Sequence, residues 1–275
     1  MNPAPIGVFD SGLGGLTVVA QILNKLPDES VVYLADTAHV PYGERPLDEI
    51  RGFALDITAF LHGLGAKMVV MACNMSSATA LGPAREAFPD TPVLGVIQPG
   101  SRAAIRVAAG RPVGVLATTG TVSSRAYSTA IRAAAPEIEV YEQACPEFVP
   151  LVESGESESA RAYAAARRCV EPLVKAGVRT IILGCTHYPF LSSAIAAAAG
   201  PSVRLIDPAE ETALQIDNTL TELGARAPLA TAPRHRFFCT GDPDGFAEIG
   251  GKFIRSRIER VERAVWGVDL GKVLA

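Results

Sequence analysis

The chain contains an internal repeat that sets two cysteines at equivalent positions. Residues 65–74 (GAKMVVMACN) align without a gap with residues 177–186 (GVRTIILGCT). Gly65 to Gly177 and Cys73 to Cys185 are both separated by 112 residues. A repeat on the scale of a domain constrains the fold more than any local pattern, because both copies should adopt the same arrangement of elements.

Two further matches occur in the same order. Residues 6–11 (IGVFDS) match residues 113–118 (VGVLAT) at a separation of 107, and Val32-Tyr33 match Val140-Tyr141 at 108. Buried parallel strands all read as runs of Val, Ile and Leu, so one such match could arise by chance. Three matches with slowly growing separations predict two homologous arrays that differ by small loop insertions.

The pattern between these matches predicts an α/β fold. Short apolar runs alternate with Ala-rich segments that favour helices, which is typical of parallel sheets with helical crossovers. Strands are expected at residues 6–9, 31–34, 68–71, 93–96, 113–116, 138–141, 180–183 and 203–206, and helices at 47–61, 76–88, 124–134, 160–176 and 189–199.

The repeat predicts two similar, pseudo-symmetric domains, each a parallel sheet flanked by helices, with the active site in the cleft between them. The first domain comprises residues 1–97 and 210–275 and carries Asp10 and Cys73. The second comprises residues 98–209 and carries Cys185 and His187. The segment from Asp207 onward is expected to return to the first domain.

Composition excludes several classes of protein. The net charge is −4 without a basic run, which disfavours nucleic acid as a partner. No apolar stretch approaches the roughly 20 residues of a membrane span, and residues 1–5 do not begin a signal peptide pattern. Five cysteines form an odd number without a CxxC pair, which fits a reducing compartment. We therefore expect a cytoplasmic protein that does not bind membranes.

Polar motifs follow the predicted strands, at the ends where ligands bind in parallel sheets. In the first half these are Asp10-Ser11, residues 36–43 and Cys73-Asn74. In the second half they are residues 118–121, 147–153 and 185–187. The two repeat-equivalent cysteines thus open polar loops in both halves.

Two thiols on opposite sides of one cleft suit the racemisation of an amino acid. A racemase that lacks an electron sink must remove the α-proton on one face and return a proton on the other. Two cysteines can do this, because local polar groups tune the thiol pKa of about 8.5 toward neutrality. The alternative for any cysteine is a buried core residue, which is the interpretation for Cys145, Cys169 and Cys239.

Each thiol needs a neighbour to accept or orient its proton. Asp10 is the natural partner of Cys73, although it could instead cap the helix that follows residues 12–15. His187 lies two residues after Cys185, with Glu153 as a candidate to orient the imidazole. A structural loop histidine is the alternative for His187. No metal site is predicted, because Cys185-x-His187 is too short a ligand pattern. Cys73, Asp10 and Glu153 could complete a ligand set, but nothing else in the sequence favours it.

The remaining motifs suit an α-amino acid with a second carboxylate. The glycine-rich residues 10–15 lack the lysine of a phosphate loop and would present backbone N–H groups to a carboxylate. Polar donors and acceptors are expected from Ser11, Asn74, Thr118, Thr121 and Thr186. Pro41-Tyr42-Gly43 predicts a tight turn with further backbone donors, or only an ordinary turn. His39, His62 and His235 are interpreted as structural.

Taken together, residues 7–16 (GVFDSGLGGL), Asp36 with Pro41-Tyr42-Gly43, residues 72–74 (ACN) and residues 183–189 (LGCTHYP) resemble the glutamate racemases of the aspartate/glutamate racemase family. The similarity spans nearly the whole chain. It implies cofactor-independent interconversion of L- and D-glutamate, which supplies D-glutamate for peptidoglycan synthesis. It also implies a homodimer.

The resemblance also implies roles for individual residues. Cys73 would act on D-glutamate and Cys185 on L-glutamate, assisted by Asp10, His187 and Glu153. The substrate would be bound by Ser11, Pro41, Tyr42, Gly43, Asn74, Met75, Thr118, Thr121 and Thr186. Met75 departs from the family pattern, which has Thr or Ser there. Its backbone N–H survives but a hydroxyl contact does not, and the side chain could instead fill the core.

Other functions remain open at this point. Aspartate racemase is the nearest enzymatic alternative, and a hydantoin racemase or decarboxylase relative is more distant. A non-catalytic amino-acid-binding or regulatory protein would not require two thiols. A thiol redox sensor is disfavoured because the chain lacks a CxxC pair. Turnover with glutamate or aspartate separates these possibilities.

Overall fold

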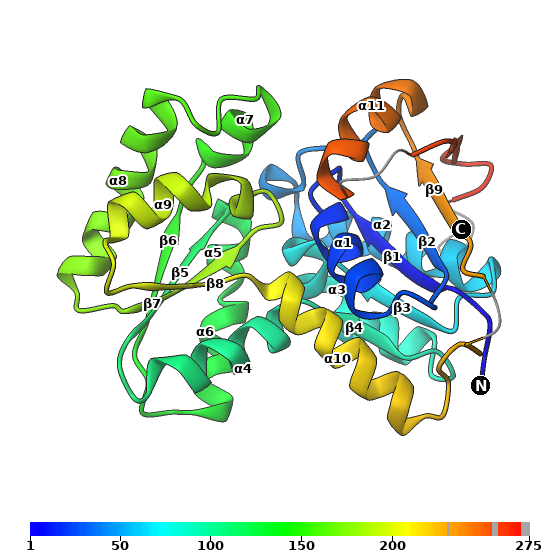
Figure 1. Ribbon diagram of the computed structural model, residues 1–275, viewed down its shortest axis with the longest axis horizontal. Helices are drawn as coiled ribbons and strands as arrows, with labels where there is room; N and C mark the ends of the chain where they lie inside the picture. Colours follow the sequence, from blue (N-terminus) through cyan, green and yellow to red (C-terminus); the bar gives the residue numbers. More distant parts are fainter. Residues whose placement is uncertain (230–231, 255–257, 271–275) are drawn as a thin grey trace. The chain divides into compact units, whose positions relative to one another are not determined.

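The computed structural model describes residues 1–229, 232–254 and 258–270 of the chain (Figure 1). It divides into two compact units, Met1–Val96 with Thr212–Ala275, and Ile97–Glu211. The boundary between the units falls inside helix α10 (Pro208–Glu222). No helix among the described residues is long and apolar enough to cross a membrane.

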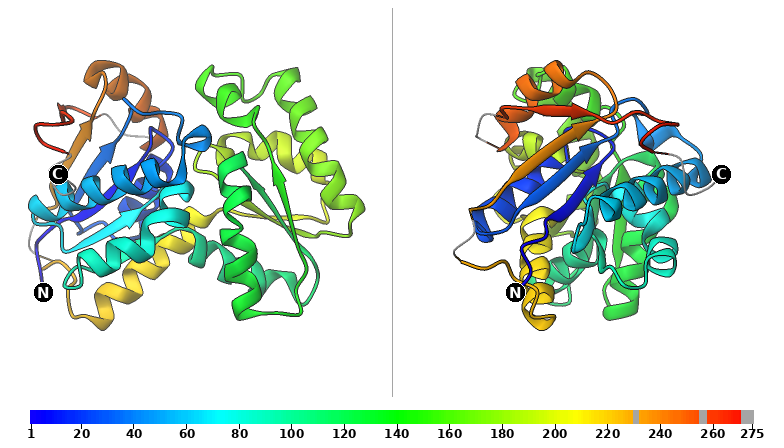
Figure 2. Two further views of the ribbon diagram at one scale, coloured as in Figure 1. Left: turned by 180° about the vertical axis from the view of Figure 1, so that it is seen from behind. Right: turned by 90° about the vertical axis from the view of Figure 1, so that its right-hand side faces the viewer.

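Unit one is built on a six-stranded parallel sheet in the order β10-β9-β2-β1-β3-β4. Its strands are β1 (Ile6–Asp10), β2 (Val31–Ala35), β3 (Met68–Met71), β4 (Val93–Gly95), β9 (His235–Cys239) and β10 (Val261–Arg263). Its helices are α1 (Leu16–Lys25), η1 (Tyr42–Glu44), α2 (Leu47–Gly63), α3 (Asn74–Ala87) and α11 (Pro243–Ile254). Figures 1 and 2 show α2 and α3 on one face of this sheet and α1 and α11 on the other.

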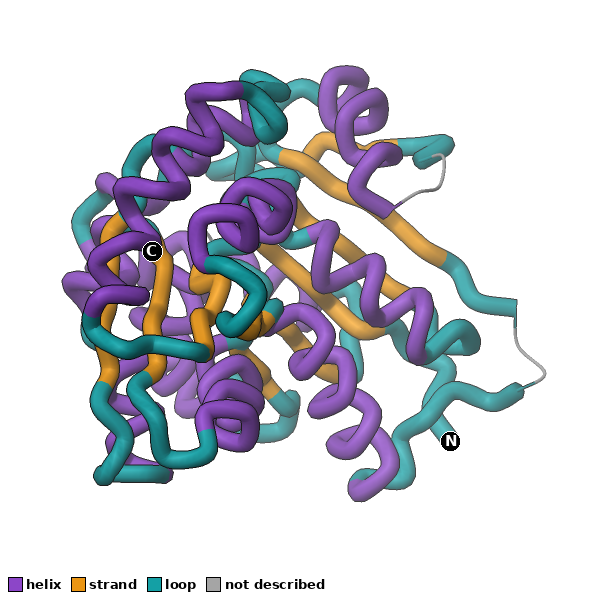
Figure 3. Tube along the Cα trace, turned by 60° about the vertical axis from the view of Figure 1, so that its left-hand side comes forward, coloured by secondary structure: helices purple, strands orange, loops and turns teal. Residues whose placement is uncertain are grey.

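Unit two is built on a four-stranded parallel sheet in the order β6-β5-β7-β8. Its strands are β5 (Val113–Ala117), β6 (Val140–Ala144), β7 (Thr180–Gly184) and β8 (Arg204–Ile206). Its helices are α4 (Ile97–Ala108), α5 (Thr119–Ser124), α6 (Ala126–Ala134), α7 (Phe148–Glu153), α8 (Ala160–Lys175), η2 (Tyr188–Leu191) and α9 (Ser192–Ala199). Helices α8 and α9 pack together on one face, and α4 and α6 on the other (Figure 1). Figure 3 shows the strands of the chain flanked by helices.

The predicted α/β class and its repeat are confirmed by the strand order. The order β2-β1-β3-β4 in unit one corresponds to β6-β5-β7-β8 in unit two. Gly7 lies opposite Val69 in unit one, and Gly114 lies opposite Ile181 in unit two. Gly7 and Gly114 are 107 residues apart, and Val69 and Ile181 are 112 residues apart, as the sequence matches predict. The first and third strands of the two units are therefore equivalent residue by residue.

The third sequence match is wrong by one residue. Gly7 pairs with Val32, whereas Gly114 pairs with Tyr141, so Val32 corresponds to Tyr141 rather than to Val140. A slip of one residue moves a side chain to the other face of a sheet. Strand β6 is only partly buried along its length. The pattern of apolar residues in β6 is therefore too weak to predict its register against β5.

Several predicted elements differ at their ends. The strand expected at 138–141 is β6 at Val140–Ala144, because Ile138 is buried in the turn before the strand. The helix expected at 124–134 is α6, which begins at Ala126 because Arg125 adopts the left-handed conformation with φ of 56° and separates it from the short helix α5. The segment 189–199 starts as the 3₁₀ turn η2 and continues as α9. The expected helices do not include α1, α4, α5, α7, α10 or α11.

A buried ion pair connects three segments of unit one. Lys67 Nζ lies 2.6 Å from Glu29 Oε2, with both side chains at most 4% exposed. Lys67 also donates to the carbonyls of Asn2 and Ala225, each at 2.8 Å. Glu29 Oε1 accepts from the backbone N–H of Ala227 at 2.8 Å. The pair thereby fastens both the N-terminal segment and the chain after α10 to the amino end of β3.

We expect Lys67→Met to destabilise the protein by about 3–5 kcal/mol, because it leaves the Glu29 carboxylate buried without its counter-charge. Urea denaturation followed by circular dichroism measures the change. The control is Lys175→Met, which breaks the exposed pair with Glu171 and should leave the free energy of unfolding almost unchanged. Equal losses in the two variants would contradict a special role for the buried pair.

Candidate active site

In unit one, strand pairing brings Asp10 and Cys73 to neighbouring strand ends. Phe9 pairs with Met71, and the N–H of Ala72 donates to the carbonyl of Phe9 at 2.9 Å. Asp10 and Cys73 follow directly, and both are buried. Burial raises the pKa of the Tyr33 phenol well above its usual value, and the nearby Asp10 and Cys73 raise it further. The three side chains thus share one buried region.

Asp10 organises the glycine-rich loop that follows β1. Its Oδ2 accepts from the backbone N–H of Gly15 at 2.9 Å and of Gly12 at 3.3 Å. Tyr33 donates its hydroxyl to the carbonyl of Gly12 at 2.6 Å. The N-cap of α1 is Gly15 itself, so Asp10 does not occupy the cap position that the alternative interpretation gave it. It instead holds the loop through backbone donors.

Tyr42 and Met75 pack against the first thiol. A small apolar cluster comprises Tyr42, Ile50, Cys73 and Met75, with Phe53 against it. Met75 is 3% exposed, so its side chain fills the space beside Cys73 that a smaller hydroxyl residue would leave open. Burial, followed by the adjacent Asp36 carboxylate, raises the pKa of Tyr42 well above its usual value. Tyr42 therefore stays a neutral hydrogen-bond donor.

The other predicted binding residues of unit one lie at the same end of the sheet. Ser11 directly follows β1, and Asn74 is the first residue of α3 and is buried. Pro41 is exposed and caps the turn η1, which contains Gly43. The structure thus gathers Asp10, Cys73, Tyr42 and Met75, with Ser11 and Asn74 next to them in the chain.

In unit two, Cys185 and His187 form the second polar group. Cys185 follows β7, and its Sγ lies 3.9 Å from Nδ1 of His187. The other ring nitrogen, Nε2, lies 3.5 Å from Oε1 of Glu153, the last residue of α7. The His187 side chain is 8% exposed and that of Glu153 is 55% exposed. An ion pair this exposed is weak, so Glu153 is a modest orienting group for the imidazole.

Threonines surround the strand ends of unit two. Thr118 follows β5 and caps α5, at the position that the repeat makes equivalent to Ser11. The hydroxyls of Thr118 and Thr121 lie 3.1 Å apart. Thr121 and Thr186 are both buried. The predicted binding residues of unit two therefore also occupy the carboxyl edge of their sheet.

Sequence reasoning gave no role to two acids that follow strands. Asp36 follows β2 and is fully buried, and Asp207 follows β8. Burial raises the pKa of Asp207. Burial also raises the pKa of the Tyr127 phenol, and the nearby Asp207 and Cys185 raise it further. The signal that could have found Asp207 is its place after the fourth strand of the repeat. Of the remaining cysteines, Cys145 and Cys239 are buried and Cys169 is partly buried.

Comparison with known proteins agrees with this architecture. The family described as Asp/Glu/hydantoin racemase matches residues 6–216. A glutamate racemase from Beutenbergia cavernae is 45% identical, over 96% of this chain and 94% of its own length. The crystal structure of a glutamate racemase from Bacillus anthracis aligns with a TM-score of 0.92 at 37% identity, over 97% of this chain and 99% of that chain.

A second crystal structure, of the glutamate racemase from Francisella tularensis in complex with D-glutamate, aligns with a TM-score of 0.90 at 33% identity. The alignment covers 96% of this chain and 98% of that chain. Two parallel sheets that each end in a thiol-bearing polar loop define an α/β racemase fold. The chain belongs to the Asp/Glu/hydantoin racemase family, and within it to the glutamate racemases.

The contacts of Gly15 generate a prediction about the loop that Asp10 holds. A Cβ at this position would overlap Cβ of Asp10 and come within 2.8 Å of the Tyr33 hydroxyl. We expect Gly15→Ala to displace both side chains and to cost about 1–3 kcal/mol of stability. Thermal unfolding followed by circular dichroism measures this cost.

The matched control is Gly63→Ala, at the end of α2, where a Cβ meets nothing within 4 Å. That substitution should be neutral or stabilising by up to about 1 kcal/mol. If Gly15→Ala behaved like this control, the close packing of Asp10 and Tyr33 around the loop would not hold.

Proposed function

We propose that the protein interconverts L- and D-glutamate by a two-base proton transfer at the α-carbon. In one direction the Cys73 thiolate removes the α-proton of D-glutamate, and the Cys185 thiol donates a proton to the opposite face of the carbanion. The product is L-glutamate, with the Cys73 thiol and the Cys185 thiolate left behind. In the other direction the two sulfurs exchange roles, so no net proton is consumed.

The observation that carries this proposal is the equivalence of the two thiols. Cys73 follows β3 and Cys185 follows β7, and these strands have the same position and register in the two sheets. A binding protein that only recognised an amino acid would need no such pair. Removal of a proton on one face and its return on the other requires two acid–base groups, one on each face.

The neighbours of each thiol supply the polar environment that the chemistry needs. Asp10 lies beside Cys73 and is fixed by two backbone N–H donors, so its carboxylate is held in place. His187 lies within hydrogen-bond reach of Cys185 and can accept or return its proton. We assign Asp10 and His187 as the assistants of Cys73 and Cys185, with Glu153 orienting the imidazole.

For substrate binding, we assign the carboxylates of glutamate to backbone N–H groups and hydroxyls at the strand ends. Ser11 and Asn74 with the Tyr42 turn contribute from unit one, and Thr118, Thr121 and Thr186 contribute from unit two. Pro41, Gly43 and Met75 shape the wall. We favour glutamate as the substrate, because the similar crystal structure of the glutamate racemase from Francisella tularensis is a complex with D-glutamate. Racemisation of aspartate is the alternative within the same fold.

We further infer that the protein acts in the cytoplasm as a homodimer and that its D-glutamate enters peptidoglycan synthesis. These inferences rest on the resemblance to glutamate racemases and on the charge and cysteine content of the sequence. Size-exclusion chromatography with light scattering tests the dimer, and an elution mass of one chain would overturn it.

The function is tested with purified protein and D-glutamate in D2O. We expect loss of optical rotation together with incorporation of deuterium at the α-carbon, followed by circular dichroism and NMR. Cys73→Ala and Cys185→Ala should each lower the rate of inversion by about 10²–10⁴-fold, since each removes one of the two acid–base groups.

The matched control is Cys239→Ala, which removes a buried thiol of unit one that takes no part in the proposed transfer. It should retain activity. Turnover of aspartate alone would keep the mechanism and change the substrate, with Met75 as the first residue to replace. Absence of deuterium incorporation into either amino acid would refute the racemase and favour an amino-acid-binding protein.

A further inference from the structure

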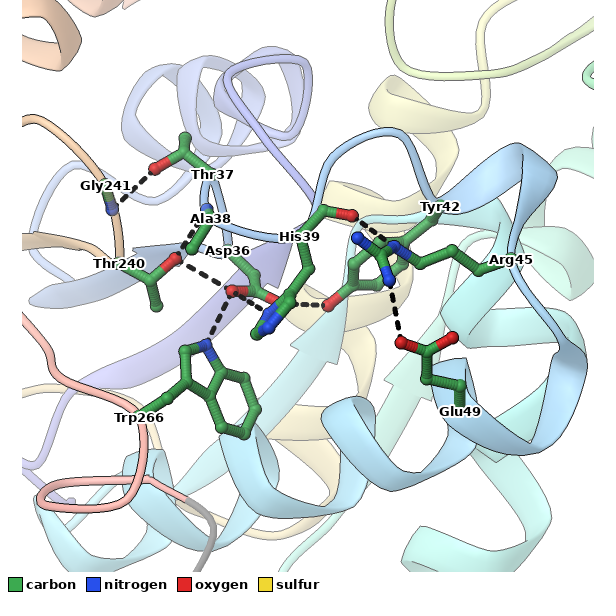
Figure 4. Close-up of polar contacts among 10 residues, drawn as sticks. All are labelled: Asp36, Thr37, Ala38, His39, Tyr42, Arg45, Glu49, Thr240, Gly241 and Trp266. Carbon is green, nitrogen blue, oxygen red and sulfur yellow. Dashed lines mark hydrogen bonds and ion pairs between the residues drawn. The ribbon is translucent and has the colours of Figure 1, made fainter.

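The buried carboxylate of Asp36 collects donors from three segments of unit one. Thr240 Oγ1 donates to Oδ1 at 2.8 Å and Trp266 Nε1 donates to the same oxygen at 2.9 Å. The Tyr42 hydroxyl donates to Oδ2 at 2.6 Å. His39 Nδ1 lies 2.9 Å from Oδ2 and 3.0 Å from Oδ1. Figure 4 shows these side chains converging on the carboxylate.

These donors come from parts of the chain that are far apart in sequence. His39 and Tyr42 lie in the loop after β2, Thr240 directly follows β9, and Trp266 lies in the turn after β10. Asp36 and Trp266 are separated by 230 residues. A fully buried carboxylate depends on such donors, because burial without them carries a large desolvation cost. The C-terminal segment is thus part of the environment that fixes Asp36.

The two oxygens of the Asp36 carboxylate accept hydrogen bonds from different donors. Thr240 and Trp266 bond Oδ1, and Tyr42 bonds Oδ2. Because both oxygens belong to one rigid plane, the donors on Oδ1 set the direction in which Oδ2 presents its lone pairs to Tyr42. Loss of the indole N–H would leave this plane less well defined.

Aromatic packing links the same segments. The rings of His39 and Phe53 are stacked with centroids 4.1 Å apart. Trp266 contacts His39 edge-on at 5.0 Å and Phe53 at 5.2 Å, and Phe53 contacts Tyr42 at 5.9 Å. Trp266 therefore contacts the loop both by its hydrogen bond to Asp36 and by its ring contacts with His39 and Phe53. Replacement of Trp266 by phenylalanine would keep the ring contacts and remove the hydrogen bond.

The end of this chain of contacts is the proposed catalytic thiol. Tyr42 packs in one cluster with Cys73 and Met75, and Phe53 lies against the same cluster. Arg45 also ties the loop down, since its Nε donates to the carbonyl of His39 at 2.6 Å and its guanidinium pairs with Glu49. The position of Tyr42 thus shapes the wall beside Cys73.

We propose that Trp266 is a positioning residue for substrate binding. Its indole N–H fixes the Asp36 carboxylate, which in turn orients Tyr42 and the backbone of residues 41–43 for the substrate. The segment after β10 thereby sets the affinity of a site to which it contributes no contact of its own. This inference rests on the proposed racemase function.

The decisive variant is Trp266→Phe, which keeps a ring against His39 and Phe53 but removes the N–H donor. We expect KM for D-glutamate to rise about five- to tenfold, with kcat within about twofold of the native value, because one donor to a charged group is lost from the binding loop. In an Asp36→Asn background the same substitution should change KM by less than about twofold, because the shared partner is already altered.

A matched control separates the indole bond from mere attachment of the C-terminal segment. Arg236→Gln removes the paired contacts between Arg236 on β9 and Glu262 on β10, at 3.0 and 3.1 Å, without touching Asp36. It should leave KM unchanged. An equal rise of KM in Arg236→Gln and Trp266→Phe would overturn the proposal, as would an unchanged KM in Trp266→Phe.

The only tryptophan of the chain is Trp266, so its fluorescence reports directly on this network. Titration of the native protein with D-glutamate should change the emission until the site is saturated. An emission that did not respond to D-glutamate in an active enzyme would count against the inference while leaving the racemase intact. Absence of turnover together with an unresponsive emission would refute both the racemase and the inference.

Discussion

The pairing of the first and third strands in each unit is the constraint on which the candidate site depends. Parallel pairing of β1 with β3 fixes Asp10 and Cys73 at adjacent strand ends, and the pairing of β5 with β7 does the same for Thr118 and Cys185. The register is enforced by fully buried apolar strands, in which a slip of one residue would exchange the side chains packed on the two faces of the sheet. The strand register that stabilises the sheets therefore also places the thiols.

Placing polar groups in such a buried region has a cost, which the loops offset. Asp10 is satisfied in part by backbone N–H groups of a loop that only a glycine at position 15 allows to approach. Asp36 is satisfied by side chains from the segments that follow β2, β9 and β10. In both cases the donors are supplied by segments that also shape the surroundings of Cys73. The polar networks of unit one thus serve the fold and the site together.

The sequence predicts local and repeated features better than distant ones. The eight strands of the repeat and the equivalence of Cys73 with Cys185 follow from apolar runs and matched spacing, because both signals lie within short stretches of chain. The contact between Asp36 and Trp266 spans 230 residues and leaves no periodic trace, so no local pattern reports it. The break between α5 and α6 depends on one backbone conformation at Arg125, which its residue type does not predict. The roles of the site residues stay predictions until they are tested by turnover.

The two half-sites are alike in their strands but not in their side chains. Cys73 is buried beside a carboxylate held by backbone donors, whereas Cys185 is partly buried beside an imidazole that contacts an exposed carboxylate. The enantiomers of glutamate have equal free energy in water, so the proposed racemase must have equal kcat/KM in the two directions. Unequal half-sites can therefore make kcat differ between the two directions only by the same factor as KM. The unlike partners of the thiols, and the support that Trp266 gives to Tyr42 in unit one alone, would set how tightly each enantiomer binds and leave the balance between them to thermodynamics.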